Sequence, residues 1–92
     1  MIYTVRITTK FKKDIKQIKK QGKNLNKLYA LVEKIAMGEA LDKKYKDHLL
    51  SGDYSGFREC HIEPDWLLVY QIDDEEIILL LSRTGSHSDL FR

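Results

Sequence analysis

The chain has 92 residues, of which 33% are charged and 42% hydrophobic, and its formal net charge is +2. That length fits one domain with its own core and leaves no room for a second, so we expect a single domain over residues 1–92. No apolar run approaches the ~20 residues that span a bilayer, and no signal-peptide hydrophobic region follows Met1, so we expect a cytoplasmic protein with no membrane partner. The single cysteine excludes an internal disulfide framework and also fits a reducing compartment.

Charge is distributed unevenly along the chain. Residues 1–46 hold thirteen Lys and Arg against four acids, whereas residues 47–92 hold three Arg against ten acids. A basic half on a nearly neutral protein suggests one surface that meets a polyanionic partner. A lysine-rich helix that is simply solvated explains the charge equally well, so both interpretations stay open.

The first elements in chain order are a strand and two helices. Residues 2–8 alternate and are rich in β-branched and aromatic side chains, which predicts a strand. Over residues 8–22 the apolar side chains recur at i, i+4 and i+7, which predicts a helix that a glycine ends. A second helix is predicted over residues 24–37, with an asparagine at its start as a potential N-cap and a glycine just after its end.

The second half predicts a loop and then three strands. Residues 39–53 show no clear period and predict a long loop with room for one helical turn. The strands are expected over residues 54–63, 66–73 and 75–85, with an acidic DDEE hairpin turn between the last two. These last two strands are apolar on both faces, which places them centrally. The expected fold is therefore α+β, in the order β-α-α-β-β-β, with two N-terminal helices packed on one face of a four-stranded, antiparallel-dominated sheet.

Titratable side chains gather where the predicted strands end. His61 lies near the end of one strand, Asp65 follows it in the turn, and Arg83 and His87 lie at the end of the last strand. Because antiparallel neighbours begin and end at the same edges of a sheet, we expect these side chains to lie together. Alternation along FRECHIE also places His61 on the face opposite the apolar core.

Each of these positions has an ordinary structural interpretation as well. His48 lies in the predicted loop and is most simply a surface residue. Asp65, which follows a proline, is commonly a turn former. Trp66 more often packs in a core than against a base, and Cys60 is most simply a small buried hydrophobe.

A metal site is a competing interpretation of three histidines and an aspartate. Zinc proteins with such ligands usually carry HxxxH or HExxH spacings or a second cysteine, and this sequence has none of these. The segments GDYSG and RTGS also lack the lysine and spacing of a phosphate-binding loop. We therefore expect no metal and no cofactor.

The segments DHLLSGDYSGFRECHIEPDWLLVY and SRTGSHSDLF, at 47–70 and 82–91, closely resemble the YafQ group of the RelE/ParE toxin superfamily, and the resemblance extends over the whole chain. Members are bacterial type II toxins, ribosome-dependent endoribonucleases that cut messenger RNA in the ribosomal A site. The resemblance implies a RelE-like fold, a ribosome and messenger RNA as partners, and a cognate antitoxin, DinJ-like or other.

Position by position, the resemblance also implies roles for individual residues. The implied catalytic residues are His48, His61, Asp65 and His87, and the implied substrate-binding residues are Arg83 and Phe91, with Trp66 as a further candidate. RNA cleavage by its own 2′-hydroxyl needs a base, an acid and a cation for the phosphorane, but no metal. We expect His87 to be the acid, His61 or Asp65 the base, and Arg83 the cation.

Two other functions remain open from the sequence. A toxin of the same fold that binds and inhibits a protein such as gyrase would need no His/Asp/Arg set. A pure binding module would use its basic helices only to dock nucleic acid. The presence of the His/Asp/Arg set favours the nuclease.

Overall fold

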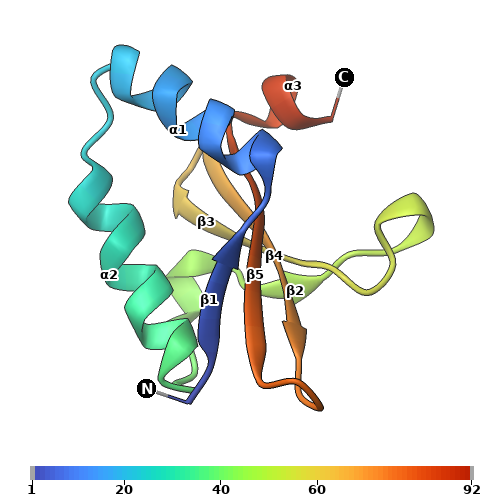
Figure 1. Cartoon of the computed structure of the whole chain (residues 1–92). Helices are drawn as coiled ribbons and strands as arrows, with labels where there is room; N and C mark the ends of the chain where they lie inside the picture. The colour runs from blue at the N-terminus through green and yellow to red at the C-terminus, as the bar shows by residue number, and fades with distance from the viewer. Residues whose placement is uncertain (1, 92) are drawn as a thin grey trace.

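A computed structural model describes residues 2–91 of the chain (Figure 1). The strands and helices in chain order are β1 Thr4–Ile7, α1 Thr9–Lys20, α2 Leu25–Ala36, the 3-10 turn η1 Lys43–Tyr45, β2 His48–Leu49, the 3-10 turn η2 Gly52–Tyr54, β3 Arg58–Glu63, β4 Trp66–Asp73, β5 Ile78–Gly85 and α3 His87–Leu90. The sheet has the order β1-β5-β4-β3-β2, and its neighbours are antiparallel except for the parallel pair β1 and β5. Among the described residues, no helix is long and apolar enough to cross a bilayer.

The α+β class and the central position of β4 and β5 are confirmed, but the expected number of strands is wrong. The sheet has five strands because β2 forms inside the segment that we expected to be a loop. Only two residues of β2 pair with β3, His48 with Glu59 and Leu49 with Arg58. A strand of that length is too short to leave an alternating pattern in the sequence. The single turn α3 escaped prediction for the same reason.

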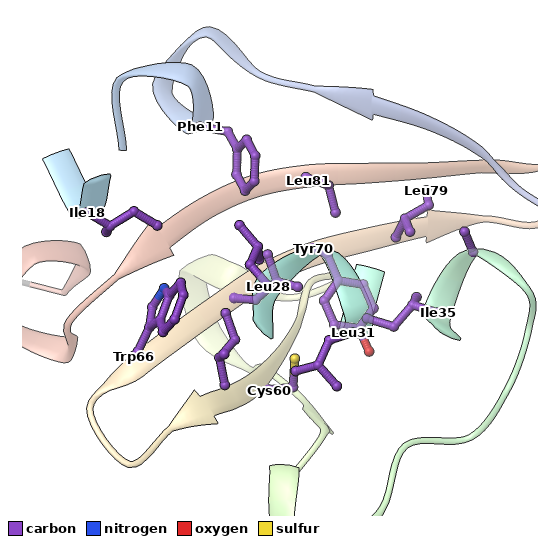
Figure 2. Close-up of a cluster of buried hydrophobic side chains, with 13 residues drawn as sticks. Phe11, Ile18, Leu28, Leu31, Ile35, Cys60, Trp66, Tyr70, Leu79 and Leu81 are labelled. Atoms are coloured by element: carbon purple, nitrogen blue, oxygen red, sulfur yellow. The ribbon is translucent and has the colours of Figure 1, made fainter. Parts of the chain in front are cut away.

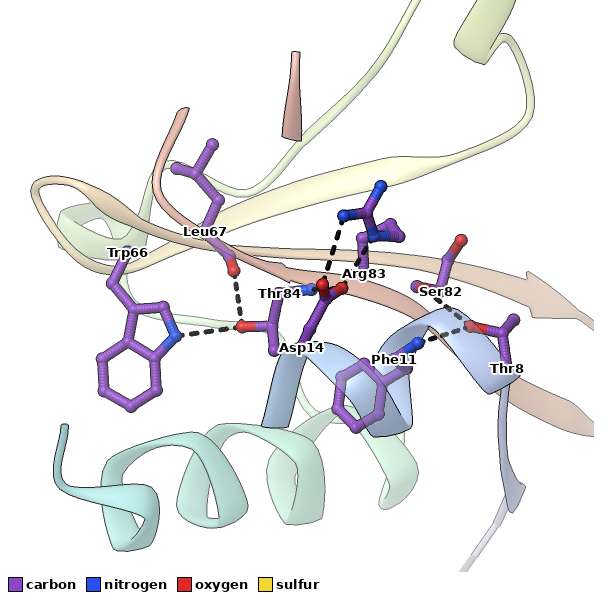
Figure 3. A network of polar contacts seen from close by, with 8 residues as sticks. All are labelled: Thr8, Phe11, Asp14, Trp66, Leu67, Ser82, Arg83 and Thr84. Carbon is purple, nitrogen blue, oxygen red and sulfur yellow. Dashed lines mark hydrogen bonds and ion pairs between the residues drawn. The ribbon is translucent and has the colours of Figure 1, made fainter. Parts of the chain in front are cut away.

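Both long helices begin at side chains that cap their free amides. Asn24 accepts a hydrogen bond from the amide of Asn26, and Thr8 Oγ1 accepts one from the amide of Phe11 at 3.0 Å. The Thr8 hydroxyl also donates to the carbonyl of Ser82 at 2.7 Å. The cap of α1 is thus bonded to β5 as well, so this helix begins against the strand that it covers (Figure 3).

The main core lies between the sheet and the helices α1 and α2. Figure 2 shows side chains of both helices directed toward those of β3, β4 and β5. Its buried members are Phe11, Ile18, Leu28, Leu31, Ile35, Ala36, Cys60, Ile62, Trp66, Leu68, Tyr70, Leu79 and Leu81. Burial raises the pKa of the Cys60 thiol to about 12, so this cysteine is an inert core residue, as its simplest interpretation had it.

A buried hydrogen-bonded chain joins β4 to β5 at one end of this core. The indole Nε1–H of Trp66 donates to Thr84 Oγ1 at 2.9 Å, and the Thr84 hydroxyl donates to the carbonyl of Leu67 at 2.8 Å (Figure 3). Trp66 and Thr84 are almost fully buried. Because buried polar groups need partners, this chain allows a tryptophan and a threonine to sit in an apolar core.

We expect Thr84→Val to lower the free energy of unfolding by about 1–3 kcal/mol, because it leaves the buried Trp66 N–H without an acceptor. Urea unfolding followed by the fluorescence of the only tryptophan measures the change. Thr84→Ser is the matched control, since it keeps the hydroxyl and removes one methyl group, worth about 0.8 kcal/mol. A Thr84→Val protein as stable as the wild type would show that the hydroxyl contributes nothing.

Candidate functional site

The register of the sheet brings the ends of β3, β4 and β5 together, as predicted. His61 on β3 lies opposite Leu67 on β4, which lies opposite Gly85 at the end of β5. A neighbouring row runs from His48 through Glu59 and Val69 to Arg83. Residues that pair across a sheet share a face, so this row and His61 belong to the sheet face of Leu67 and Val69, the face opposite the main core.

A small second core forms the floor of this face. Leu67 and Val69 are buried against Leu90 of α3, and three partly buried side chains, Leu50, Phe57 and Phe91, pack around them. The covering elements are thus the segment after β2 and the C-terminal turn α3, rather than the long helices. The polar residues of the two rows lie around this apolar floor.

His48 and His61 share one buried carboxylate. Glu59 Oε1 lies 3.7 Å from His48 Nε2 and 3.6 Å from His61 Nε2, and the Glu59 side chain is only 8% exposed. A carboxylate at this position can stabilise a positive charge on either ring. Glu59 was not among the residues predicted for the site. The only sequence signal for it was the alternation of FRECHIE, which puts Glu59 and His61 on one face.

Backbone carbonyls fix the proton on each of these two rings. His48 Nδ1 lies 2.6 Å from the carbonyl oxygen of Lys46, and His61 Nδ1 lies 3.2 Å from that of Pro64. A carbonyl only accepts hydrogen bonds, so Nδ1 must carry a proton in both rings. In both histidines Nε2 is therefore the atom that can take up or give a proton.

The residue before His48 is anchored in the core. Asp47 accepts hydrogen bonds from the Tyr70 hydroxyl and from Arg58 Nη2, the latter at 3.0 Å. Burial, together with this bond to Asp47, raises the pKa of the Tyr70 hydroxyl, so it stays a donor. The bond to Asp47 likewise raises the pKa of Arg58. The predicted loop is thus held firmly at the point where it presents His48.

Asp65 holds the start of α3. Its Oδ1 accepts a hydrogen bond from the backbone amide of His87 at 3.1 Å, and the Ser86 hydroxyl accepts one from the amide of Asp89 at 3.2 Å. These bonds satisfy free amides at the first turn of a helix. The structure thus brings Asp65 and His87 together, as expected, and joins the carboxylate to the backbone of His87.

Aromatic rings line the C-terminal side of the site. The Phe91 ring lies 5.1 Å from the His87 ring and 5.1 Å from the Tyr54 ring, measured between centroids. Tyr54 belongs to η2 and is exposed, so it is a further residue that sequence reasoning missed. Nothing in its local sequence distinguished it, because the contact joins segments 37 residues apart.

Arg83 is held by an aspartate of the first helix. Its Nε and Nη2 donate to the two carboxylate oxygens of Asp14 at 2.7 and 3.1 Å, and the amide of Thr84 donates to Asp14 Oδ2 at 3.1 Å (Figure 3). The hydrogen bond to Asp14 raises the pKa of Arg83, which therefore stays charged. The side chain remains 29% exposed, and Nη1 makes no bond to Asp14. Asp14 was not expected here, because the other charged side chains of its helix are lysines.

The proposal of Trp66 as a substrate-binding residue is wrong for this structure. Its side chain is 0% exposed and its indole N–H is bonded to Thr84. A base has no access to a ring in that position, so Trp66 is a core residue. Trp66 begins β4, and α2 covers this strand. The sequence did not reveal which face of β4 is covered, because β4 is apolar on both faces.

A metal centre is not apparent in the part of the chain that the structure describes. Residues 2–91 contain no group of three or more His, Cys, Asp or Glu side chains arranged to hold a metal ion. The arrangement they do contain is a pair of imidazoles around a carboxylate, a third imidazole on α3 and a fixed guanidinium. Chemically, this set supplies proton donors and acceptors beside a cation that binds anionic oxygens.

Known proteins resemble this chain over nearly its whole length. The "mRNA interferase toxin YafQ" of Escherichia coli K12 is 42% identical over 82 residues, which cover 88% of this chain and 87% of the relative. A "Putative toxin YafQ" of Haemophilus influenzae is 33% identical over 89 residues, 91% of this chain and 87% of the relative.

Solved structures agree with these relatives. A metal-bound toxin from Helicobacter pylori is 49% identical with a TM-score of 0.91, and the match covers 97% of this chain and 99% of that one. YafQ in the E. coli DinJ–YafQ complex is 37% identical with a TM-score of 0.88, over 98% and 99% of the two chains. The sequence model of the family described as "Bacterial toxin of type II toxin-antitoxin system, YafQ" matches residues 3–92. The chain therefore belongs to the YafQ family of bacterial type II toxins.

Proposed function

We propose that this protein is an endoribonuclease that cuts translated messenger RNA in the ribosomal A site, without a metal, by attack of the RNA 2′-hydroxyl on the adjacent phosphorus. The observation that carries the proposal is the pair of Nε2 atoms of His48 and His61, with their Nδ1 protons fixed, around Glu59. The name of the E. coli relative, an mRNA interferase, agrees with this class of enzyme. Because translated messages lie in the cytoplasm, the proposal also places the protein there.

His61 acts as the base in this mechanism. Its Nε2 removes the proton of the 2′-hydroxyl, and the charge that the ring gains is stabilised by Glu59 Oε1, 3.6 Å away. Asp65, the alternative base, already accepts a hydrogen bond from the amide of His87 and serves to hold α3. His48 lies on the other side of Glu59 and binds phosphate or supports the same carboxylate.

His87 and Arg83 act on the other side of the scissile bond. The 2′-oxygen forms a bond to phosphorus, the bond from phosphorus to the 5′-oxygen breaks, and His87 gives a proton to that leaving oxygen. Arg83 offers its remaining N–H groups to the phosphorane oxygens, since Asp14 binds only part of the guanidinium. The products are a 2′,3′-cyclic phosphate and a 5′-hydroxyl.

Phe91 and Tyr54 form a stacking surface beside the acid. The Phe91 ring is edge-on to Tyr54 and tilted against His87. Single-stranded RNA is commonly held by stacking its splayed bases on such rings. A base stacked on Phe91 would place the neighbouring phosphate next to His87. The lysines of the N-terminal half then supply contacts to ribosomal RNA phosphates.

A same-fold toxin that binds and inhibits a protein is the rival function. It would leave messages intact and would have no use for fixed imidazole tautomers. Expression in cells followed by mapping of transcript ends separates the two functions.

We expect cuts inside codons of translated messages only, with products that end in a 2′,3′-cyclic or 3′-phosphate. Because the nucleophile belongs to the RNA, cleavage should continue in a translation extract when divalent ions are chelated and polyamines keep the ribosomes intact. Sequencing of the fragments, with and without opening of the cyclic phosphate followed by phosphatase treatment, identifies the ends. Products with a 3′-hydroxyl would contradict the mechanism, and intact messages would favour the rival.

His87→Ala should slow cleavage by about 10²–10⁴-fold, or about 3 to 5.5 kcal/mol in barrier, because the leaving oxygen loses its proton donor. The His87 side chain is exposed, so stability should change by no more than about 0.5 kcal/mol. Single-turnover cleavage on programmed ribosomes and thermal melting measure the two effects. Gln17→Ala, an exposed change on α1, is the control and should cut at the normal rate. A His87→Ala protein that cuts normally would remove this residue from the mechanism.

A cognate antitoxin is the proposed protein partner, as in the E. coli DinJ–YafQ toxin–antitoxin complex. We expect it to carry an acidic, partly disordered segment that folds across the basic surface or the site. Co-expression with the product of the neighbouring reading frame should restore growth, and the two proteins should copurify. His87→Ala toxin should copurify equally well, since the exchange leaves the basic surface intact. No rescue and no copurification would contradict the pairing.

A further inference from the structure

A basic cavity lies beside His61, on the side of the sheet end that faces α2. It has a volume of about 640 Å³ and is lined by α2, η1 and the end of β3. The side chains that matter for its chemistry are Lys27, Lys34, Lys44, Tyr45, Lys46 and His61. The volume falls within the range of ~300–1,000 Å³ that is usual for small-ligand sites.

Three of the four lysines that line this cavity form no ion pair with any carboxylate in the described part of the chain. Lys27 is paired with Glu63, with a distance of 2.8 Å between Nζ and Oε2, and Lys23 approaches the same carboxylate at 3.4 Å. The hydrogen bond from Lys27 is the main reason that the pKa of Glu63 is lowered. Within residues 2–91, by contrast, none of Lys34, Lys44 and Lys46 forms a salt bridge. The cavity therefore attracts anions.

The cavity shares His61 with the proposed catalytic cluster. His61 belongs to its wall, and the Nε2 of the same ring lies 3.6 Å from Glu59. Lys46 connects the two regions as well, because its side chain lines the cavity while its carbonyl accepts the hydrogen bond from His48. An RNA strand with its 2′-hydroxyl at His61 would therefore have this basic cavity next to it.

We propose that this cavity binds the sugar–phosphate backbone of single-stranded RNA, in the part of the message adjacent to the cleaved phosphodiester. Lys34, Lys44 and Lys46 contact phosphates, and Lys27 keeps Glu63 from repelling them. The inference rests on the proposed function, since it takes the position of the cleaved bond from His61. The charges of the cavity would also accept an acidic peptide. A peptide, however, has no group that requires the adjoining histidine cluster.

The test measures RNA binding without cleavage. The probe is a fluorescent single-stranded oligonucleotide with 2′-O-methyl groups throughout, which cannot be cut because it has no 2′-hydroxyl. Its affinity for the full chain is measured by fluorescence anisotropy at several salt concentrations. The pocket variant is Lys34→Gln/Lys44→Gln/Lys46→Gln, which removes the three charges and keeps polar side chains. The control variant, Lys10→Gln/Lys13→Gln/Lys16→Gln, removes the same charge from α1, away from this cavity.

Each lost phosphate contact on a single strand lowers the slope of log affinity against log salt by about 0.7, so the pocket variant should lose about 2 units of slope. The control variant should keep a slope within about 0.7 of the wild type. Thermal melting of both variants checks that they are folded, and Lys34→Gln alone, with an expected loss of about 0.7, serves if the triple variant is not.

Two results would overturn the inference. The first is an equal loss of slope in both variants, which would mean that RNA responds only to total charge. The second is a pocket variant that binds RNA like the wild type but no longer copurifies with the antitoxin, which would assign the cavity to an acidic peptide. Cleavage by the wild-type protein on ribosomes is measured separately, so a failed cavity and a failed nuclease assignment are distinguishable.

Discussion

The pairing of β4 with β5 around Thr84 is the constraint on which the rest of the structure depends. The hydroxyl of Thr84 joins Trp66 to Leu67, and the backbone amide of Thr84 donates a hydrogen bond to Asp14 of α1. One threonine thus ties the core, the central strand pair and the first helix together. These bonds hold the end of β5, where Arg83 lies, against β4 and α1. The proposed catalytic set is spread over four segments and would need such support, because small displacements of catalytic groups reduce rate strongly.

Carboxylates orient the basic groups of the proposed site. Asp14 holds Arg83, Asp47 anchors the segment before His48, Glu59 lies between two imidazoles, and Asp65 fixes α3. An RNA-binding site would be expected to exclude acids because they repel phosphate. Here each acid is bonded to a cation, a hydroxyl, an imidazole or an amide, so it positions a neighbour while contributing little free negative charge. Three of the ten acids in residues 47–92, Asp47, Glu59 and Asp65, are used in this way.

The basic half of the chain divides into two surfaces in the folded protein. One follows α1, whose lysines are mostly exposed, and the other surrounds the cavity beside His61. Lys23 and Lys27 take an intermediate position, since both approach Glu63 and Lys23 also lies 5.8 Å from the centroid of a Trp66 ring. In the proposed function, the first surface would attract ribosomal RNA at long range, and the second would contact the message directly. Net charge alone, at +2, would have concealed both.

The sequence by itself determined the α+β class, the two capped helices, the central strands β4 and β5, and the meeting of His61, Asp65, Arg83 and His87 at one end of the sheet. These follow from periods of 3.6 and 2 and from antiparallel pairing, which are local properties of the chain. Only the tertiary structure decided the partners of those residues: Glu59 between the histidines, Asp14 on Arg83, Tyr54 on Phe91, and Trp66 inside the core. Each of these contacts depends on which side chains the packing of distant segments brings within a few ångströms of one another, and no pattern along the chain carries that information.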